Sequence, residues 1–306
     1  MISRRRFLAI AAAGACIAPS TAEAQTVWRG HAFGSEISIA LSQGIETQRQ
    51  RALGAALDTI RRMENLFSLY DPTSALSRLN RNGRLRMPPE FARLFAQCHA
   101  IHALTHGLFD PTVQPLFATL KADEGLESGE MKALIKQSVG WRHIQRTSQD
   151  IFFGRPGMAM TLNGIAQGFS TDRVTETLAA HGFTEATVNI GEYRCGDSTT
   201  RIAITNDGGR SLHSFDLRSG AVATSSTTGF TFANGRGHIL SPTHGSTEPV
   251  WRTLSVVADN AALADGLSTA LCLADDESLA ETLLQKGTIR LAVLERTTGE
   301  VLVLGG

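Results

Sequence analysis

The sequence predicts an α+β fold, built as one large unit of mixed sheets and helices; two lobes around a central cleft are an open alternative. Helical stripes of apolar residues dominate the chain before Gly140, and short β-rich segments dominate after it. No internal repeat, low-complexity linker or charge block separates the two parts. The length of 306 residues and the 42% hydrophobic content allow a substantial core.

The first 24 residues are expected to be a cleaved export signal. Residues 3–8, SRRRFL, are followed by a small apolar run, and Ala22-Glu23-Ala24 supplies the small residues of a signal-peptidase site. The adjacent arginines before Phe-Leu favour the twin-arginine type. An ordinary secretory signal is one alternative; lipid attachment at Cys16 is another, which Ala13 disfavours because lipoproteins prefer Leu there. We therefore expect a mature domain of residues 25–306 in the periplasm, without a membrane-spanning segment.

Apolar spacing predicts the elements of the first part in order. Partial alternation over residues 27–41 predicts a strand, and a helical stripe over residues 48–67 predicts a long helix that Asp71-Pro72 ends. Next come a turn or short helix over 74–79, a helix over 88–104, and a proline-containing loop leading into a short helix over 107–120.

The second part alternates between strands and helices. A helix over residues 166–181 is expected among β-rich segments at 143–144, 151–153, 158–162, 186–190, 201–205 and 214–217. A strand over 253–257 precedes helices over 261–273 and 277–286. The last two segments, 290–295 and 301–304, are joined at Thr298-Gly299 and predict a hairpin.

Charge and cysteine content exclude several classes of protein. Lys+Arg and Asp+Glu both number 29, and this balance argues against a nucleic-acid partner, which usually requires a basic excess. The mature chain would keep Cys98, Cys195 and Cys272, an odd number at spacings that match no zinc motif. Each is therefore predicted to be a small buried hydrophobe.

Four segments could carry chemistry. Residues 162–169, LNGIAQGF, lead from a strand into a helix whose first N–H groups could bind a phosphate, although a simple tight turn is equally compatible. Asp265 and Thr269 share one face of the helix over 261–273 and could complete a Mg²⁺ site with ligand phosphates, or could be a polar cap. His238 could be a catalytic base, a ligand contact or a structural histidine. Asp110 could simply cap the helix that begins at Pro111.

Eight sequence blocks in chain order resemble the FAD:protein FMN transferases, the ApbE-type flavin transferases. The resemblance covers the chain from about Gly30 to its C-terminus, and eight blocks in order are more specific than any one of them. They are SLYDPTSALSRLN (68–80), GLFDPTVQPL (107–116), VGW (139–141), LNGIAQGFSTDRV (162–174), VNIGE (188–192), ATS (223–225), HILSPTHG (238–245) and ALADGLSTAL (262–271).

The resemblance implies a flavin transferase fold in which FAD lies in a cleft with its pyrophosphate beside a divalent cation, Mg²⁺ or Mn²⁺. A Ser or Thr hydroxyl of a partner protein would attack the FMN-side phosphorus, forming a phosphoester and releasing AMP. By motif match, the cation ligands would be the Asp265 carboxylate, the Thr269 hydroxyl and the Ala166 main-chain carbonyl. His238 would deprotonate the hydroxyl or orient the phosphate, with Asp110 as its competitor. FAD contacts would come from Phe33, Tyr70, Leu108, Phe109, Asp110, Asn163, Gln167, Phe169, His238 and Ile239.

The expected acceptor is an exported or membrane-anchored electron-transfer flavoprotein, such as the one used in nitrous-oxide respiration, because related exported members serve membrane redox proteins. Two other hypotheses remain: a metal-dependent FAD pyrophosphatase that releases FMN and AMP, and a non-catalytic FAD-binding assembly factor. The latter is favoured by two of the departures from the family pattern, those at Gln167 and Ser241. Thr161, Gln167 and Ser241 replace a usual acidic residue, a lysine and an aspartate, and Glu192 and Ser226 stand where glycine is usual.

Overall fold

The structure is a computed structural model that describes residues 16–17, 26–122, 128–232, 235–246 and 248–306. The predicted export signal, with its arginine pair and cleavage site, lies outside the described residues except for strand β1 (Cys16–Ile17). This strand pairs with β8. None of the helices in the described part of the chain is both long and apolar enough to span a membrane.

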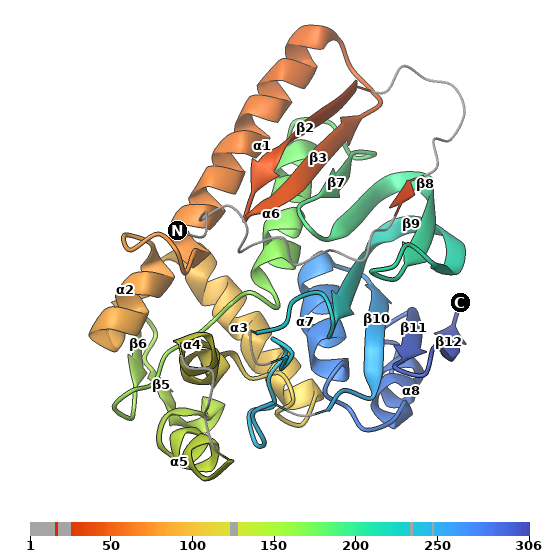
Figure 1. Ribbon diagram of the computed structural model, residues 1–306. Coiled ribbons are helices and arrows are strands. Elements are labelled where there is room, and N and C mark those ends of the chain that lie inside the picture. Colours follow the sequence, from red (N-terminus) through yellow and green to blue (C-terminus); the bar gives the residue numbers. More distant parts are fainter. Residues whose placement is uncertain (1–15, 18–25, 123–127, 233–234, 247) are drawn as a thin grey trace.

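One large sheet runs through the molecule (Figure 1). Its strands lie in the order β12-β11-β10-β9-β8-β7-β3-β2, and every pairing recorded between them is antiparallel. Their bounds are β2 (Thr26–Ala32), β3 (Ser35–Leu41), β7 (Thr187–Asn189), β8 (Tyr193–Thr205), β9 (Ser211–Ser226), β10 (Trp251–Ala258), β11 (Leu291–Arg296) and β12 (Val301–Gly305).

Three helices pack together against this sheet: α1 (Glu46–Phe67), α6 (Ala166–Ala180) and α7 (Ala261–Leu271) (Figure 1). Helix α6 lies between the other two and contacts both. Buried side chains of α1, α6, β3 and β7 form one hydrophobic cluster, and those of α3, α7, β10 and β11 belong to a second. Because the sheet continues from one cluster to the other, the chain forms one α+β unit.

A smaller three-stranded sheet lies beside this unit, in the order β4-β6-β5. It consists of β4 (Arg84–Arg86), β5 (Ile144–Arg146) and β6 (Asp150–Phe153). Around it lie α2 (Ala75–Asn82), α3 (Pro89–Leu104), α4 (Gln114–Ala122) and α5 (Ser128–Ser138), and short 3-10 turns at Pro111–Val113 and Trp141–His143. Helix α8 (Ser278–Gln285) follows α7.

Most predicted elements are confirmed, but two predictions are wrong. Residues 27–41 form a hairpin and not one strand, because Phe33 and Gly34, with φ of 49° and 73°, make a turn in the middle. Residues 158–162 form no strand: the Met160 N–H donates to Asn80 Oδ1, and the Thr161 N–H donates to the Pro111 carbonyl, both at 2.8 Å. The cysteine prediction holds, since Cys98, Cys195 and Cys272 are buried and unbridged.

Candidate functional site

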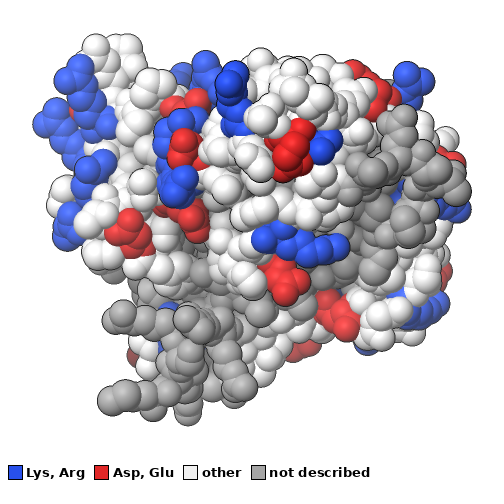
Figure 2. Space-filling view, turned by 90° about the horizontal axis from the view of Figure 1, so that it is seen from above, with Lys and Arg blue, Asp and Glu red and all other residues white. Residues whose placement is uncertain are grey.

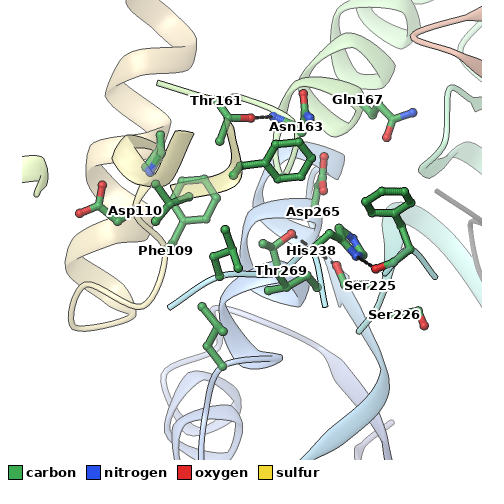
Figure 3. Close-up of a pocket in the computed structure, with 18 of the residues that line it drawn as sticks. Phe109, Asp110, Thr161, Asn163, Gln167, Ser225, Ser226, His238, Asp265 and Thr269 are labelled. Carbon is green, nitrogen blue, oxygen red and sulfur yellow. Dashed lines mark hydrogen bonds between the residues drawn. The ribbon is translucent and has the colours of Figure 1, made fainter. Parts of the chain in front are cut away.

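The main candidate site is a pocket between the loop before Pro111, the start of α6, helix α7 and the end of β9 (Figure 3). The segment around His238 closes another side. Seven of the eight family-like blocks, all except VGW (139–141), contribute residues to its lining, although they lie far apart in the sequence. These include Leu108, Phe109, Asp110, Asn163, Gln167, Glu192, Thr224, Ser225, His238, Ile239, Asp265 and Thr269.

Two glycines allow α6 and α7 to approach closely at this pocket. A Cβ on Gly164 would lie 2.9 Å from Thr269 Oγ1, and one on Gly168 would lie 2.3 Å from the Ala261 carbonyl oxygen. The close approach lets the Gly168 N–H, near the start of α6, donate to Asp265 Oδ2 at 3.0 Å. The glycines of the LNGIAQGF segment therefore do more than form a turn: they allow α6 and α7 to cross in close contact.

Asp265 is a buried carboxyl that faces the pocket, with 4% of its surface exposed. Burial raises its pKa to about 7, the Gly168 hydrogen bond opposes the shift, and the Asp172 carboxylate adds to it. In the described chain, its second oxygen, Oδ1, accepts no hydrogen bond. Thr269, one turn further along α7, brings its hydroxyl to the same wall, 3.4 Å from Ser225 Oγ.

Glu192 places a second carboxyl in this pocket, with 8% of its surface exposed. Its Oε2 accepts the Thr224 N–H at 3.2 Å. Burial raises the pKa of Glu192 well above the ordinary value, and the neighbouring Asp265 raises it further. Simultaneous ionisation of Asp265 and Glu192 in this pocket is therefore unfavourable unless a cation binds near both carboxylates.

Helix α7 is held in place by Asp172 of α6. Its two carboxylate oxygens accept the N–H groups of Ala261 and Ala262 at 2.8 and 2.9 Å, and the side chain also pairs with Arg194. These bonds satisfy donors that every helix N-terminus leaves free. Asp172 therefore fixes the helix that carries Asp265 and Thr269.

His238 projects toward the pocket (Figure 3). Its Nδ1 lies 2.8 Å from the Phe230 carbonyl oxygen, which can only accept, so Nδ1 carries the proton. Burial lowers the pKa of His238, while the Phe230 hydrogen bond and the charge of Asp207 oppose the shift. The ring is therefore neutral at neutral pH, and its Nε2 is left as a proton acceptor.

Asp110 has a structural role, as its position before Pro111 suggested. Its Oδ1 accepts the N–H and the hydroxyl of Thr112 at 2.9 and 2.6 Å, and its Oδ2 accepts the Trp141 N–H at 2.9 Å. In Figure 3 the carboxylate points away from Asp265. With both oxygens occupied, Asp110 shapes the pocket wall and is a weaker candidate for a base than His238.

The predicted metal ligands and flavin contacts mostly converge. Tyr70, Asn163 and Gln167 line both the main pocket and a smaller side cavity, to which Phe33 and Ala166 belong. The Ala166 carbonyl accepts the Ser170 hydroxyl at 2.6 Å. Phe169 lines neither cavity: its ring is buried edge-on against Phe67, with centroids 5.7 Å apart.

A sequence profile described as the ApbE family matches residues 33–293. The chain belongs to the ApbE family. The FAD:protein FMN transferase of Chlamydia trachomatis is 28% identical over 165 residues, 51% of either chain, and that of Haemophilus influenzae is 27% identical over 260 residues, 75% of this chain and 74% of the relative. The alignments to the two chlamydial relatives thus span about half of their length, 51% and 56%.

The solved structure of an ApbE protein from Thermotoga maritima has the same fold. It superposes with a TM-score of 0.80 at 24% identity, and the match covers 91% of this chain and 96% of the other. This likeness establishes the α+β architecture shared with ApbE proteins.

Sequence reasoning gave no role to several residues of the site. Glu192 was noted only as a departure from the ApbE pattern, and Thr224 and Ser225 only as part of a matching block, yet all three line the pocket. Asp172, at the DRV end of LNGIAQGFSTDRV, could have been identified from the sequence. An aspartate inside an apolar helix face requires a buried partner. Among the described residues, no group of three His, Cys, Asp or Glu side chains gathers as a metal site.

Proposed function

We propose that this chain transfers FMN from FAD to a Ser or Thr hydroxyl of an exported partner protein and releases AMP. One juxtaposition supports the proposal most directly. A single pocket combines a carboxylate–hydroxyl pair on α7, Asp265 and Thr269, with the free Nε2 of neutral His238. This arrangement provides oxygen ligands for a cation next to a proton acceptor.

The donor set fits a hard divalent cation, Mg²⁺ or Mn²⁺. These ions prefer carboxylate, hydroxyl and carbonyl oxygens and take the remaining ligands from phosphates and water. Asp265 and Thr269, with the Ala166 carbonyl at the start of α6, would supply the protein ligands. The buried Asp265 carboxyl needs such a partner, because its burial disfavours the ionised form. When bound, the cation neutralises diphosphate charge and the charge that develops on the AMP leaving group.

FAD would extend through more than one cavity. The main pocket encloses about 140 Å³ and the side cavity about 110 Å³, and both are smaller than the ~300–1,000 Å³ usual for ligand sites. They share Tyr70, Asn163 and Gln167, so an elongated dinucleotide can pass from one to the other. Gln167, in place of the usual lysine, contacts Ser35 Oγ at 3.2 Å and offers an uncharged amide near the diphosphate.

In the transfer step, His238 Nε2 takes the proton of the acceptor hydroxyl as its oxygen attacks the FMN-side phosphorus. The new phosphorus–oxygen bond forms while the bond from that phosphorus to the AMP phosphate oxygen breaks. The fixed Nδ1–H bond to the Phe230 carbonyl keeps the ring oriented for this transfer.

The test is incubation of the purified mature chain with FAD, Mg²⁺ and a panel of exported redox proteins. We expect a mass gain of one FMN unit on an acceptor, in-gel flavin fluorescence and release of AMP, all lost with EDTA. Release of AMP with free FMN and no labelled acceptor would identify a pyrophosphatase instead. Absence of AMP release and of FAD affinity would overturn the proposal.

We also propose that the chain acts in the periplasm, after export directed by the twin-arginine signal predicted in residues 1–24. A fusion of residues 1–24 to a reporter active only outside the cytoplasm tests this. Export should depend on the twin-arginine translocase, and Arg4→Lys/Arg5→Lys should abolish it. Export through the general secretory route would contradict the twin-arginine assignment.

A further inference from the structure

A second, wider hollow adjoins the main pocket. The two share part of their lining, because Leu108 and Asp110 line both of them. It has a volume of about 1150 Å³. It is lined by residues of α3, of α5 and of the Trp141–His143 turn. We call this hollow the α5 groove.

Three cationic side chains gather at the α5 groove, from three separate segments. Lys136 lies in the last turn of α5, Arg142 belongs to the Trp141–His143 turn, and Arg155 follows β6. Arg155 Nη1 donates to the Lys136 carbonyl at 2.8 Å, and Arg142 Nε donates to His143 Nε2 at 3.2 Å. Both arginines also lower the pKa of His143, whose largest shift comes from burial.

None of the three has an acidic partner in the described part of the chain. Elsewhere arginines pair with nearby carboxylates, as Arg49 does with Glu46 and Arg61 with Asp58 on α1. On the face seen in Figure 2, basic and acidic side chains are interspersed. Among the described residues, one carboxylate lines the α5 groove, that of Asp110, and it already accepts three hydrogen bonds from Thr112 and Trp141.

We propose that the α5 groove docks an acidic segment of the acceptor protein, next to the hydroxyl that receives FMN. This inference rests on the proposed function and specifies its partner. The acceptor must reach the FMN-side phosphorus, and the α5 groove adjoins the main pocket, because Leu108 and Asp110 line both. Unpaired cations on such a rim steer and orient a partner of opposite charge.

The first test measures binding of a short fluorescein-labelled oligoglutamate peptide by fluorescence anisotropy at low ionic strength. An oligoglutamine peptide of the same length is the comparison. The variant Lys136→Gln/Arg142→Gln/Arg155→Gln removes the groove charges. Because Arg155 also bonds to the backbone of α5, the double variant Lys136→Gln/Arg142→Gln repeats the test with that bond intact.

The matched control is Arg29→Gln/Arg51→Gln/Lys286→Gln. It removes the same number of arginines and lysines from exposed positions on β2, on α1 and after α8. Both triple variants therefore have the same net charge, so a difference between them reports the location of the charge. Circular dichroism and FAD affinity should be the same in wild type and all variants.

We expect oligoglutamate to bind wild type and the control, and the dissociation constant to rise roughly tenfold or more in the groove triple variant. With a labelled acceptor, the groove variant should raise KM for the acceptor and leave kcat unchanged. Equal binding of oligoglutamate to the groove variant and to wild type, or no binding to wild type, would overturn the inference.

Displacement of the peptide by AMP, with AMP binding lost in the groove variant, would make the α5 groove a nucleotide site and also overturn it. A wild-type protein that binds oligoglutamate but transfers no FMN would contradict the proposed function alone.

Discussion

Replacement of Asp265 by asparagine separates the charge of this side chain from its size. Asparagine keeps an oxygen that can accept the Gly168 N–H and fills the same space, but it cannot become an anion. The variant should therefore fold, lose cation affinity and lose FMN transfer. Its metal-free stability should depend on pH differently from that of wild type.

The magnitude follows from the pKa of Asp265, raised from 3.8 to about 7 in the folded chain. A raised pKa means that the folded state binds the proton more tightly than the unfolded state, so the contribution of Asp265 to stability is greatest below pH 4 and falls as the pH rises toward 7. At about 1.4 kcal/mol per pH unit, the loss is up to about 4 kcal/mol. Asp265→Asn should remove this loss and be the more stable protein at pH 8 without metal.

Urea unfolding, followed by circular dichroism in EDTA at pH 5 and at pH 8, measures the difference directly. Addition of Mg²⁺ should then stabilise wild type and leave Asp265→Asn unchanged. Glu192 should also titrate closer to its ordinary pKa in the variant, because Asp265 contributes to its shift. Equal metal-free stability of the two proteins at pH 8, together with equal stabilisation by Mg²⁺, would refute the reasoning.

Three further perturbations probe the same site. His238→Gln should lower the transfer rate by roughly 10²–10⁴-fold with FAD affinity unchanged, as measured by AMP release; a smaller effect would exclude His238 as the base. Gly168→Ala places a methyl group 2.3 Å from the Ala261 carbonyl oxygen and should destabilise the fold by about 1–3 kcal/mol in urea unfolding. The reference variant is Gly182→Ala, where a Cβ meets nothing within 4 Å but φ is 88°, so it measures the cost of backbone strain without a steric clash. Asp172→Ala leaves the start of α7 and Arg194 without an acceptor, so it should cost about 3–5 kcal/mol and weaken Mg²⁺ binding in calorimetry; unchanged stability would show that other bonds hold α7.

The spacing of apolar residues in the sequence predicted those helices and strands whose buried side chains recur at one regular interval. Helix α1 has buried residues at helical spacing from Ala52 to Phe67, and the sequence stripe matches it. The sequence does not predict helix α5, because Met131 is its only buried apolar residue among those described, so the helix has no continuous apolar stripe. The long strands β8 and β9 were found only in part, because exposed polar residues interrupt their apolar pattern.

The segment over residues 158–162 shows a limit of pattern reading. Met158, Met160 and Leu162 are buried in alternation, as in a strand. The backbone, however, is satisfied by the Asn80 side chain, whose Nδ2 donates to the Met160 carbonyl at 2.8 Å and whose Oδ1 accepts the Met160 N–H. Alternation reports which side chains are buried, whereas a sheet also requires a neighbouring strand, and that depends on residues far away.

The site was predictable as a set of residues, but not as an arrangement. Asp265 and Thr269 could be placed on one helix face from their spacing alone. The contact between Gly168 and Asp265 joins positions 97 residues apart, and nothing in either segment specifies it.

Strand β3 pairs on one side with its neighbour in sequence, β2, but its other partner is the distant β7, where Ser38 pairs with Asn189. The pocket is closed by α7, later still in the sequence. A nascent copy therefore cannot complete this pocket until residue 269 has left the ribosome and folded. Fragments released early in synthesis would lack the α7 wall, and with it the Asp265 carboxyl and the Thr269 hydroxyl.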